Sequence, residues 1–225
     1  MTQAPLGRIH YDGRGLPRGR SSLAPLAVGA AHRDRLTHAV IGVVAGRGYA
    51  ATTVADIVAA ARVSRAAFYA QFGSKEECFL DACFQGLGLM ARAVGEVQSQ
   101  APAEPPEAVL RATIAGFVRF VVDEPAFARC FLLEMPLAGD EALRRYLAVI
   151  DMLADNTRRW HEGVLAREDA GPLRDPGVYR ILSAGAVQEA AARLRADDAA
   201  SLPGLVDDIL QLHVAALLGR APSSP

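Results

Sequence analysis

The residues best suited to chemistry in this chain lie close together between positions 53 and 75. Hydroxyl groups at Thr53 and Ser64 each precede a short helical segment, where they can cap the helix and hold an anion beside its free amides. Four side chains with cationic or hydrogen-bonding groups follow: Arg65, Tyr69, Gln71 and Lys75. Groups of this kind bind phosphate oxygens and the edges of bases. The cluster therefore predicts contact with nucleic acid.

Each of these residues suits a particular contact. Arg65 and Gln71 are the candidates to read bases, because arginine pairs with guanine and glutamine with adenine in the major groove. Ala66 and Ala67 could touch a thymine methyl group or let the helix approach closely. Lys75 is the only lysine among 24 basic residues and stands at a helix N-terminus, where the dipole does not favour it. We interpret this exception as a phosphate contact.

Two short helices must position these side chains. Thr53 and Asp56 form a variant capping box before the apolar residues Val54, Ile57 and Val58, and Ser64 caps the next helix after a tight turn. A pair of short helices at a steep angle presents the second helix to a major groove. The preceding helix is expected from Arg33 to the glycines at 46 and 48, and a longer one from Ser74 to about residue 100.

The remaining sequence predicts an all-α fold. Alanine and leucine dominate the apolar content, and further helices are expected near 106–123, 125–134, 140–167, 176–198 and 202–218, about nine in total and without strands. We predict a flexible basic arm at 1–30, a helix-turn-helix DNA-binding domain at 31–78, and a helical ligand-binding and dimerisation domain at 79–220. Two interpretations of the arm are open: an unstructured tail, or a segment that reaches phosphates or a minor groove through residues such as Arg18 and Arg20.

Charge and composition exclude several classes of protein. Residues 1–75 carry 10 basic and 3 acidic groups, a net charge of +7, whereas residues 76–225 carry 14 and 22, a net charge of −8. A basic first third suits contact with phosphates. Cys78, Cys83 and Cys130 show no metal-binding spacing, and no catalytic constellation is recognisable, so we expect no enzyme, metal or cofactor. The chain lacks a signal peptide pattern and a long apolar run, which predicts a cytoplasmic protein without a membrane span.

Residues 33–84 resemble the N-terminal DNA-binding domain of the TetR family of bacterial repressors. The resemblance rests on a series of motifs at fixed spacing: Gly48-Tyr49, Thr52-Thr53, Val54-x-x-Ile57, Ala61-Arg62-Val63-Ser64, Phe68-Tyr69-x-x-Phe72 and Ser74-Lys75-Glu76. It implies a phosphate contact for Tyr69. Two residues depart from the family pattern, Arg62 in place of glycine and Gln71 in place of histidine. We expect them to alter the turn and the sequence preference rather than to abolish binding.

The resemblance also implies a ligand pocket and a dimer. The candidate ligand-binding residues are the aromatic and polar side chains of the second half: Arg119, Phe120, Phe131, Glu134, Trp160 and Glu189. The last two predicted helices are apolar over more than one face, which suggests an intersubunit surface. The candidate interface residues are Ile181, Val187, Ala191, Leu205, Ile209 and Leu212.

Together these features predict a homodimeric repressor that binds a palindromic double-stranded DNA operator and responds to a small apolar ligand. Two alternatives remain open at this level. The chain could be an activator or a regulator controlled by a partner protein, or a helical interaction module that has lost specific DNA binding. The excess positive charge of the first third favours the DNA-binding alternatives.

Overall fold

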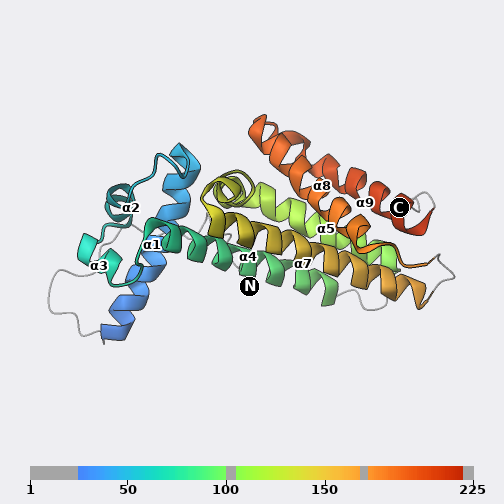
Figure 1. Ribbon diagram of the computed structural model, residues 1–225, viewed down its shortest axis with the longest axis horizontal. Helices are drawn as coiled ribbons and strands as arrows, with labels where there is room; N and C mark the ends of the chain where they lie inside the picture. Colours follow the sequence, from blue (N-terminus) through green and yellow to red (C-terminus); the bar gives the residue numbers. More distant parts are fainter. Residues whose placement is uncertain (1–24, 100–104, 168–171, 220–225) are drawn as a thin grey trace. The chain divides into compact units, whose positions relative to one another are not determined.

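The computed structural model describes residues 25–99, 105–167 and 172–219, which form helices joined by turns and include no strand (Figure 1). The α-helices are α1 (Pro25–Arg47), α2 (Val54–Ala61), α3 (Arg65–Tyr69), α4 (Lys75–Ser99), α5 (Pro106–Asp123), α6 (Pro125–Arg129), α7 (Asp140–Leu165), α8 (Pro176–Arg195) and α9 (Leu205–Leu218). A π-helix, η2 (Cys130–Glu134), and a 3₁₀ turn, η3 (Met135–Leu137), follow α6, and a second 3₁₀ turn, η4 (Ala199–Gly204), precedes α9. The predicted all-α fold is confirmed.

The first helix begins earlier than the sequence predicts. It starts at Pro25 rather than Arg33, and proline is tolerated there because the first turn needs no backbone N–H partner. Residues 25–30 are therefore helical and do not belong to the predicted arm. The rest of that arm, residues 1–24, lies outside the described residues.

The described helices form two compact units. Unit 1 contains the described residues up to Gly88 together with Asp123–Leu143, and unit 2 contains Leu89–Val122 together with the described residues from Arg144 onward. The long helix α4 contributes its first part to unit 1 and its second part to unit 2. This division concerns packing, and the proposed functional division at residues 78 and 79 stays a prediction.

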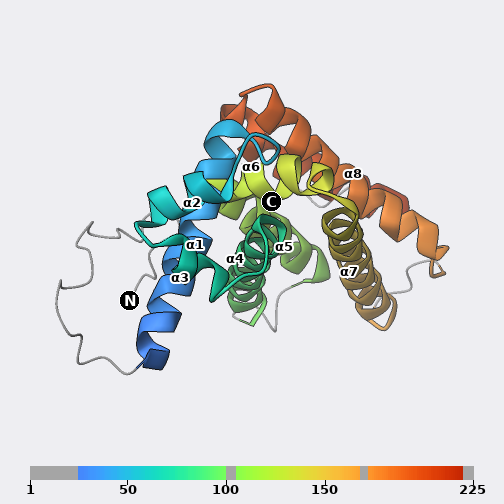
Figure 2. The same cartoon turned by 60° about the vertical axis from the view of Figure 1, so that its left-hand side comes forward.

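Unit 1 is built around α1, which packs against α2, α3, α6 and η2 (Figure 2). Its core consists of fully buried apolar side chains, among them Leu36, Val40, Val44, Ile57, Phe68, Phe72 and Phe79. A Cβ atom at Gly86 would lie 2.0 Å from the ring of Phe127. Only glycine therefore allows α4 and α6 to approach this closely.

The three cysteines lie inside unit 1 as free thiols. Burial raises the pKa of Cys78 and Cys130 to about 12, and it raises the pKa of Cys83 well above its ordinary value. The reactive form of cysteine is the thiolate, so these groups are unreactive at neutral pH while the unit is folded. They serve as small apolar core residues.

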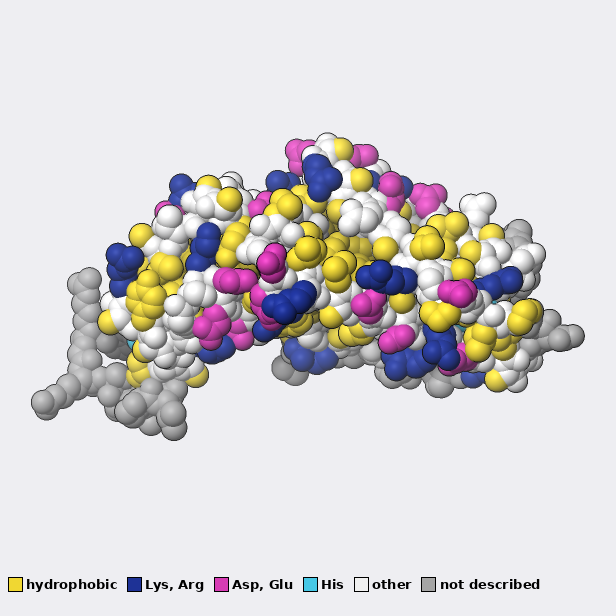
Figure 3. Space-filling view, viewed as in Figure 1, with side chains coloured by type: hydrophobic (Ala, Val, Ile, Leu, Met, Phe, Trp, Pro, Cys, Tyr) yellow, Lys and Arg dark blue, Asp and Glu magenta, His cyan; other side chains and the backbone are white. Residues whose placement is uncertain are grey.

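Unit 2 contains nearly all of α5, α8, α9, the part of α4 from Leu89 and the part of α7 from Arg144. Figure 3 shows basic and acidic side chains interspersed with apolar ones over the face that carries α7. Residues 199–218 are long and apolar enough to cross a membrane by length and composition alone. In the structure this segment packs within unit 2, where Leu202, Leu205 and Leu217 are buried. Its two aspartates form ion pairs, Asp207 with Arg111 and Asp208 with Arg193.

Two histidines are buried in unit 2. Nδ1 of His161 lies 2.9 Å from the hydroxyl of Tyr179, and that hydroxyl also accepts the backbone N–H of Arg174. Nδ1 of His213 lies 2.8 Å from the carbonyl oxygen of Ile209. Burial is the main cause that lowers the pKa of both rings, so the fold favours their neutral forms.

This preference predicts that acid destabilises the protein. An unfolded histidine titrates near pH 6.5, and the folded pKa values lie lower, so their contribution to stability is complete above that pH and is lost as the pH falls below it. We expect the free energy of unfolding to fall by up to about 1.4 kcal/mol per histidine for each pH unit in that range. Urea titrations between pH 7.5 and about pH 5 measure the slope. His161→Gln should flatten this slope, and a variant slope equal to that of the parent protein would contradict the assignment.

Candidate functional site

Hydroxyl caps fix the starts of α2 and α3. The Thr53 hydroxyl oxygen accepts the backbone N–H of Asp56, and the Asp56 carboxylate accepts the backbone N–H of Thr53 at 2.9 Å. The predicted capping box is therefore present. The Ser64 hydroxyl oxygen accepts the backbone N–H of Ala67 at 3.0 Å and caps α3 in the same way. Both hydroxyl residues are exposed, which leaves these helix starts open to an anion.

The turn between α2 and α3 depends on a left-handed residue. Arg62 has φ 54° and ψ 44°, a conformation that suits glycine, and its N–H closes the end of α2 on the carbonyl oxygens of Ala59 and Val58. The guanidinium of Arg35 in α1 donates to the Arg62 carbonyl oxygen at 2.7 Å. The departure from glycine seen in the sequence therefore falls on the one residue of this turn with a positive φ angle.

Helix α3 has a buried side and an exposed side. Phe68 and, just beyond the helix, Phe72 are buried, as predicted, and the rings of Phe68 and Tyr69 meet edge to face at 5.3 Å. Arg65, Ala66 and Tyr69 are exposed, and the Tyr69 side chain is 54% exposed. The candidate DNA-binding residues Ala67 and Gln71 are half-buried. The exposed side thus combines a guanidinium, a small residue and a phenol.

Lys75 has an internal role that the sequence did not predict. Its ammonium group donates to the carbonyl oxygens of Tyr49 and Thr52 at 2.8 and 2.9 Å and lies 4.0 Å from the centre of the Tyr49 ring. These contacts hold the loop between α1 and α2. An ammonium group has three N–H donors, so one remains for a phosphate.

Glu134 holds the same loop from the other side. Its carboxylate accepts the backbone N–H of Tyr49 at 2.8 Å and approaches Gly48, which has a positive φ angle. Glu134 ends the π-helix η2, and such helices are frequent at functional sites. This residue, a candidate ligand contact by sequence, therefore lies in unit 1 against the helix-turn-helix.

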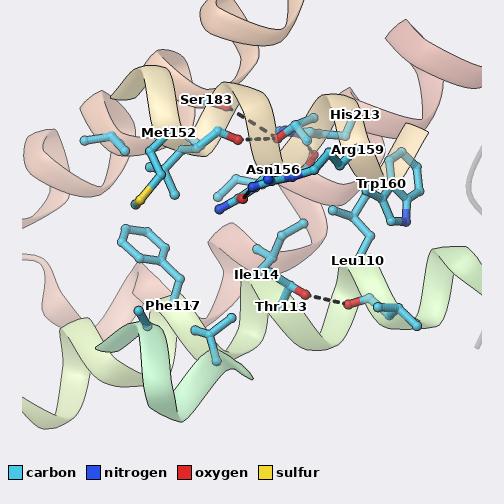
Figure 4. Close-up of a pocket in the computed structure, with 18 of the residues that line it drawn as sticks. Leu110, Thr113, Ile114, Phe117, Met152, Asn156, Arg159, Trp160, Ser183 and His213 are labelled. Atoms are coloured by element: carbon cyan, nitrogen blue, oxygen red, sulfur yellow. Dashed lines mark hydrogen bonds between the residues drawn. The ribbon is translucent and has the colours of Figure 1, made fainter. Parts of the chain in front are cut away.

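Unit 2 contains a cavity of about 660 Å³ between α4, α5, α7, α8 and α9 (Figure 4). Most of its wall is apolar, with Met90, Val94, Leu110, Ile114, Phe117, Met152, Val187 and Ile209. Its polar lining consists of Thr113, Asn156, Thr157, Arg159, Trp160, Ser183 and His213. A cavity of this size and character is typical of a small-molecule site.

Only one of the six candidate ligand residues lines this cavity. Trp160 does so, with its indole N–H donating to the Pro106 carbonyl oxygen at 2.7 Å. The other five lie elsewhere: Arg119 is exposed, Phe120 is half-buried, Phe131 stacks on Phe127 in unit 1, Glu134 holds the loop, and Glu189 pairs with Arg193. His213 also lines the cavity, a role that an isolated helical histidine does not reveal in the sequence.

The candidate interface residues also divide into two groups. Val187, Ala191, Leu205 and Ile209 are buried within unit 2, and Val187 and Ile209 line its cavity. Ile181 and Leu212 are 72% and 53% exposed. Helices α8 and α9 are apolar on several faces because one side fills the interior and another carries these exposed residues.

Comparison with known proteins identifies the N-terminal part. Residues 37–82 match the sequence profile of the bacterial regulatory proteins of the tetR family, and this stretch contains the capped helices, the turn and the start of α4 described above. The N-terminal domain is a TetR-family domain. The resemblance stated from the sequence is confirmed.

A curated relative and solved structures agree with this assignment. An uncharacterized HTH-type transcriptional regulator, YerO of Bacillus subtilis, is 27% identical over 127 residues, which are 56% of this chain and 44% of that protein. A TetR-like regulator from Rhodococcus sp. RHA1 has a TM-score of 0.66 at 19% identity and covers 92% of this chain and 100% of its own. FadR of Bacillus subtilis, solved with stearoyl-CoA, has a TM-score of 0.63 at 18% identity, covering 81% and 97%. These two structures share the fold of the chain.

The left-handed turn of this TetR-family domain predicts a difference between two variants. Arg62→Gly and Arg62→Ala both remove the side chain and its contacts, and they differ only in the Cβ atom that strains a positive φ angle. We expect the glycine variant to be more stable than the alanine variant by about 1 kcal/mol. Urea unfolding of both proteins measures this difference. An alanine variant as stable as the glycine variant would mean that the turn is not left-handed in solution.

Proposed function

We propose that the protein is a cytoplasmic transcriptional repressor that binds a palindromic operator as a homodimer and is released by a small, largely apolar ligand. The observation that carries the proposal is the exposed side of α3 within a TetR-family helix-turn-helix, where Arg65 and Tyr69 project from a helix whose opposite side is buried. The cavity in unit 2 supports the proposal that the protein binds a ligand. The proposal that the protein represses rather than activates transcription rests on the resemblance to the TetR repressors.

The proposed DNA contacts are of two kinds: contacts to phosphates, which position the protein, and contacts to base edges, which recognise the sequence. Ser64, Thr53, Tyr69 and the remaining N–H of Lys75 are suited to phosphates, whereas Arg65 is suited to a base edge. Gln71 is half-buried and its backbone carbonyl oxygen accepts from Arg33 at 3.3 Å, so only its side chain is available for a base. The alanines at 66 and 67 would allow the backbone of α3 to approach the groove.

The proposed dimer uses the outer sides of α8 and α9. On α8, Ile181, Gly185, Gln188 and Ala192 are exposed and recur at helical spacing, and on α9 Leu212 and Ala215 are exposed. Small side chains at such positions let helices of two subunits approach closely. Two copies of this surface would form a four-helix interface, and a two-fold axis would match a palindromic operator.

The ligand would act through α4. This helix carries Lys75, which holds the loop before α2, at its start, and it contributes Met90 and Val94 to the cavity further along. A ligand that displaces the second part of α4 would shift the loop and so alter the spacing of the two recognition helices in a dimer. Release of DNA requires the ligand to bind more tightly to the conformation whose recognition helices are spaced wrongly for the operator.

The FadR structure, which shares the fold of this chain, supports a ligand with an apolar part. That protein was solved with stearoyl-CoA, whose acyl chain is apolar, and it shares the fold of this chain. The cavity found here likewise has a wall composed mainly of aliphatic and aromatic side chains. An apolar ligand would gain about 25 cal/mol for each Å² of surface that it removes from water.

Selection of bound sequences from a random double-stranded pool tests the DNA-binding function. We expect an inverted repeat at physiological salt. Arg65→Gln should weaken binding to that sequence, and a phosphate contact by Arg65 would show as a salt slope of log K that is shallower by about 0.9. The control is Arg158→Gln, which makes the same charge change on α7 and should bind DNA as the parent protein does. Recovery of no motif, with binding lost as salt rises, would contradict the proposal and favour an interaction module without specific DNA binding.

Sedimentation equilibrium tests the dimer. Ile181→Asp places a charge in the proposed interface and should convert the dimer into a monomer at micromolar concentration. The matched control is Leu137→Asp, because Leu137 is 78% exposed and belongs to unit 1 rather than to α8 or α9. Dimerisation that survives Ile181→Asp would show that this side of α8 is not the interface.

A further inference from the structure

The hydroxyl groups and the indole that line the unit 2 cavity have already donated their hydrogens within the protein. Three of these hydrogens go to backbone carbonyl oxygens: Thr113 to Val109 at 2.8 Å, Thr157 to Leu153 at 3.1 Å, and Trp160 to Pro106 at 2.7 Å. Since Thr157 has given its hydrogen to Leu153, the 3.4 Å contact between Thr157 and Ser183 takes its hydrogen from Ser183 (Figure 4). The three hydroxyl groups therefore offer lone pairs to a ligand rather than hydrogens.

His213 offers the best placed of these acceptors. Its side chain is 4% exposed and lines the cavity. Nδ1 faces the Ile209 carbonyl oxygen, which can only accept, so Nδ1 carries the hydrogen of the neutral ring. Burial lowers the pKa of this histidine, which keeps the ring neutral at pH 7. Nε2, on the other edge of the ring, is then a hydrogen-bond acceptor.

The charges of the wall disfavour an ionic ligand. Among the described residues that line the cavity no carboxylate occurs, so a buried cation would lack a counter-ion. Arg159 is the one charged member of that lining, and its side chain is exposed and donates to the Asn156 side-chain oxygen. A buried anion would meet the lone pairs of the three hydroxyl groups, because the N–H donors of Asn156 and Arg159 belong to exposed side chains. An uncharged molecule avoids both penalties.

We propose that this cavity binds an uncharged, largely apolar molecule through a hydroxyl or N–H group that donates to Nε2 of His213. The inference rests on the ligand-responsive function proposed above and specifies its ligand class. His213 acts as the residue that determines specificity, because a ligand without the donor leaves a buried acceptor unsatisfied. The aliphatic and aromatic wall supplies the remaining affinity.

Trp160 provides a direct test, because it is the only tryptophan of the chain and lines the cavity. Its fluorescence is followed while the full-length protein, without DNA, is titrated with 1-decanol, decyl methyl ether, decanoate or decylammonium. These probes share one apolar chain and differ in the group at its end. We expect 1-decanol to bind about tenfold more tightly than the ether, and the ammonium not to bind.

Variants assign the preference to a residue. His213→Leu should abolish the preference for the alcohol over the ether while keeping affinity for the ether. The comparison of probes in the parent protein remains decisive if this buried variant does not fold. Arg159→Gln and Arg158→Gln form a matched pair, because Arg158 pairs with Glu162 and does not line the cavity, and Arg158→Gln should bind 1-decanol as the parent does.

Three results would overturn the inference. The first is equal affinity for the alcohol and the ether, and the second is a fluorescence that responds to none of the four probes. The third is that decanoate binds more tightly than the other three probes, and that this binding is lost in Arg159→Gln but kept in Arg158→Gln. Such a result would assign the cavity to anions. Because no DNA is present, these results are independent of operator binding, so a failure of the ligand class is distinguished from a failure of the proposed regulatory function.

Discussion

The arrangement of the helix-turn-helix depends on how one loop, residues 48–53, is held. The Lys75 ammonium binds two carbonyl oxygens of this loop, and the Glu134 carboxylate accepts one of its N–H groups. A hydrogen bond to a charged group contributes about 1.5–3 kcal/mol, more than a neutral one. The loop leads directly into the Thr53 cap, so the start of α2 is fixed against α4 and η2 by charged side chains rather than by apolar packing alone.

Local features of this domain could be read from the sequence because each depends on neighbouring residues. The caps at Thr53 and Ser64 and the strained turn at Arg62 follow from hydroxyl and glycine preferences within a few positions. The unusual character of Lys75 was also visible, but its partners were not. They lie 23 and 26 residues away, and no local pattern links a lysine to the carbonyl oxygens of a distant loop.

The cavity could not be predicted in the same way, since its wall comes from five helices that are distant in sequence. Trp160, Glu134 and Phe131 are all candidates by residue type alone, yet only Trp160 lines the cavity, whereas the other two lie in unit 1. Helical periodicity finds apolar faces but not what each face meets. For α8 and α9 it therefore could not separate the interior residue Val187 from the exposed residue Ile181.

A hydrogen bond and an ion pair join some of the helices that line the cavity. The indole of Trp160 bonds α7 to the start of α5, and the ion pair of Arg111 with Asp207 joins α5 to α9. By contrast, Met90 and Val94 of α4 contribute apolar contacts, which have no directional requirement and can adjust to a ligand with little loss of energy. Met90 and Val94 belong to the helix that begins with Lys75. A ligand that fills this cavity would act on the same helix that holds the loop before α2.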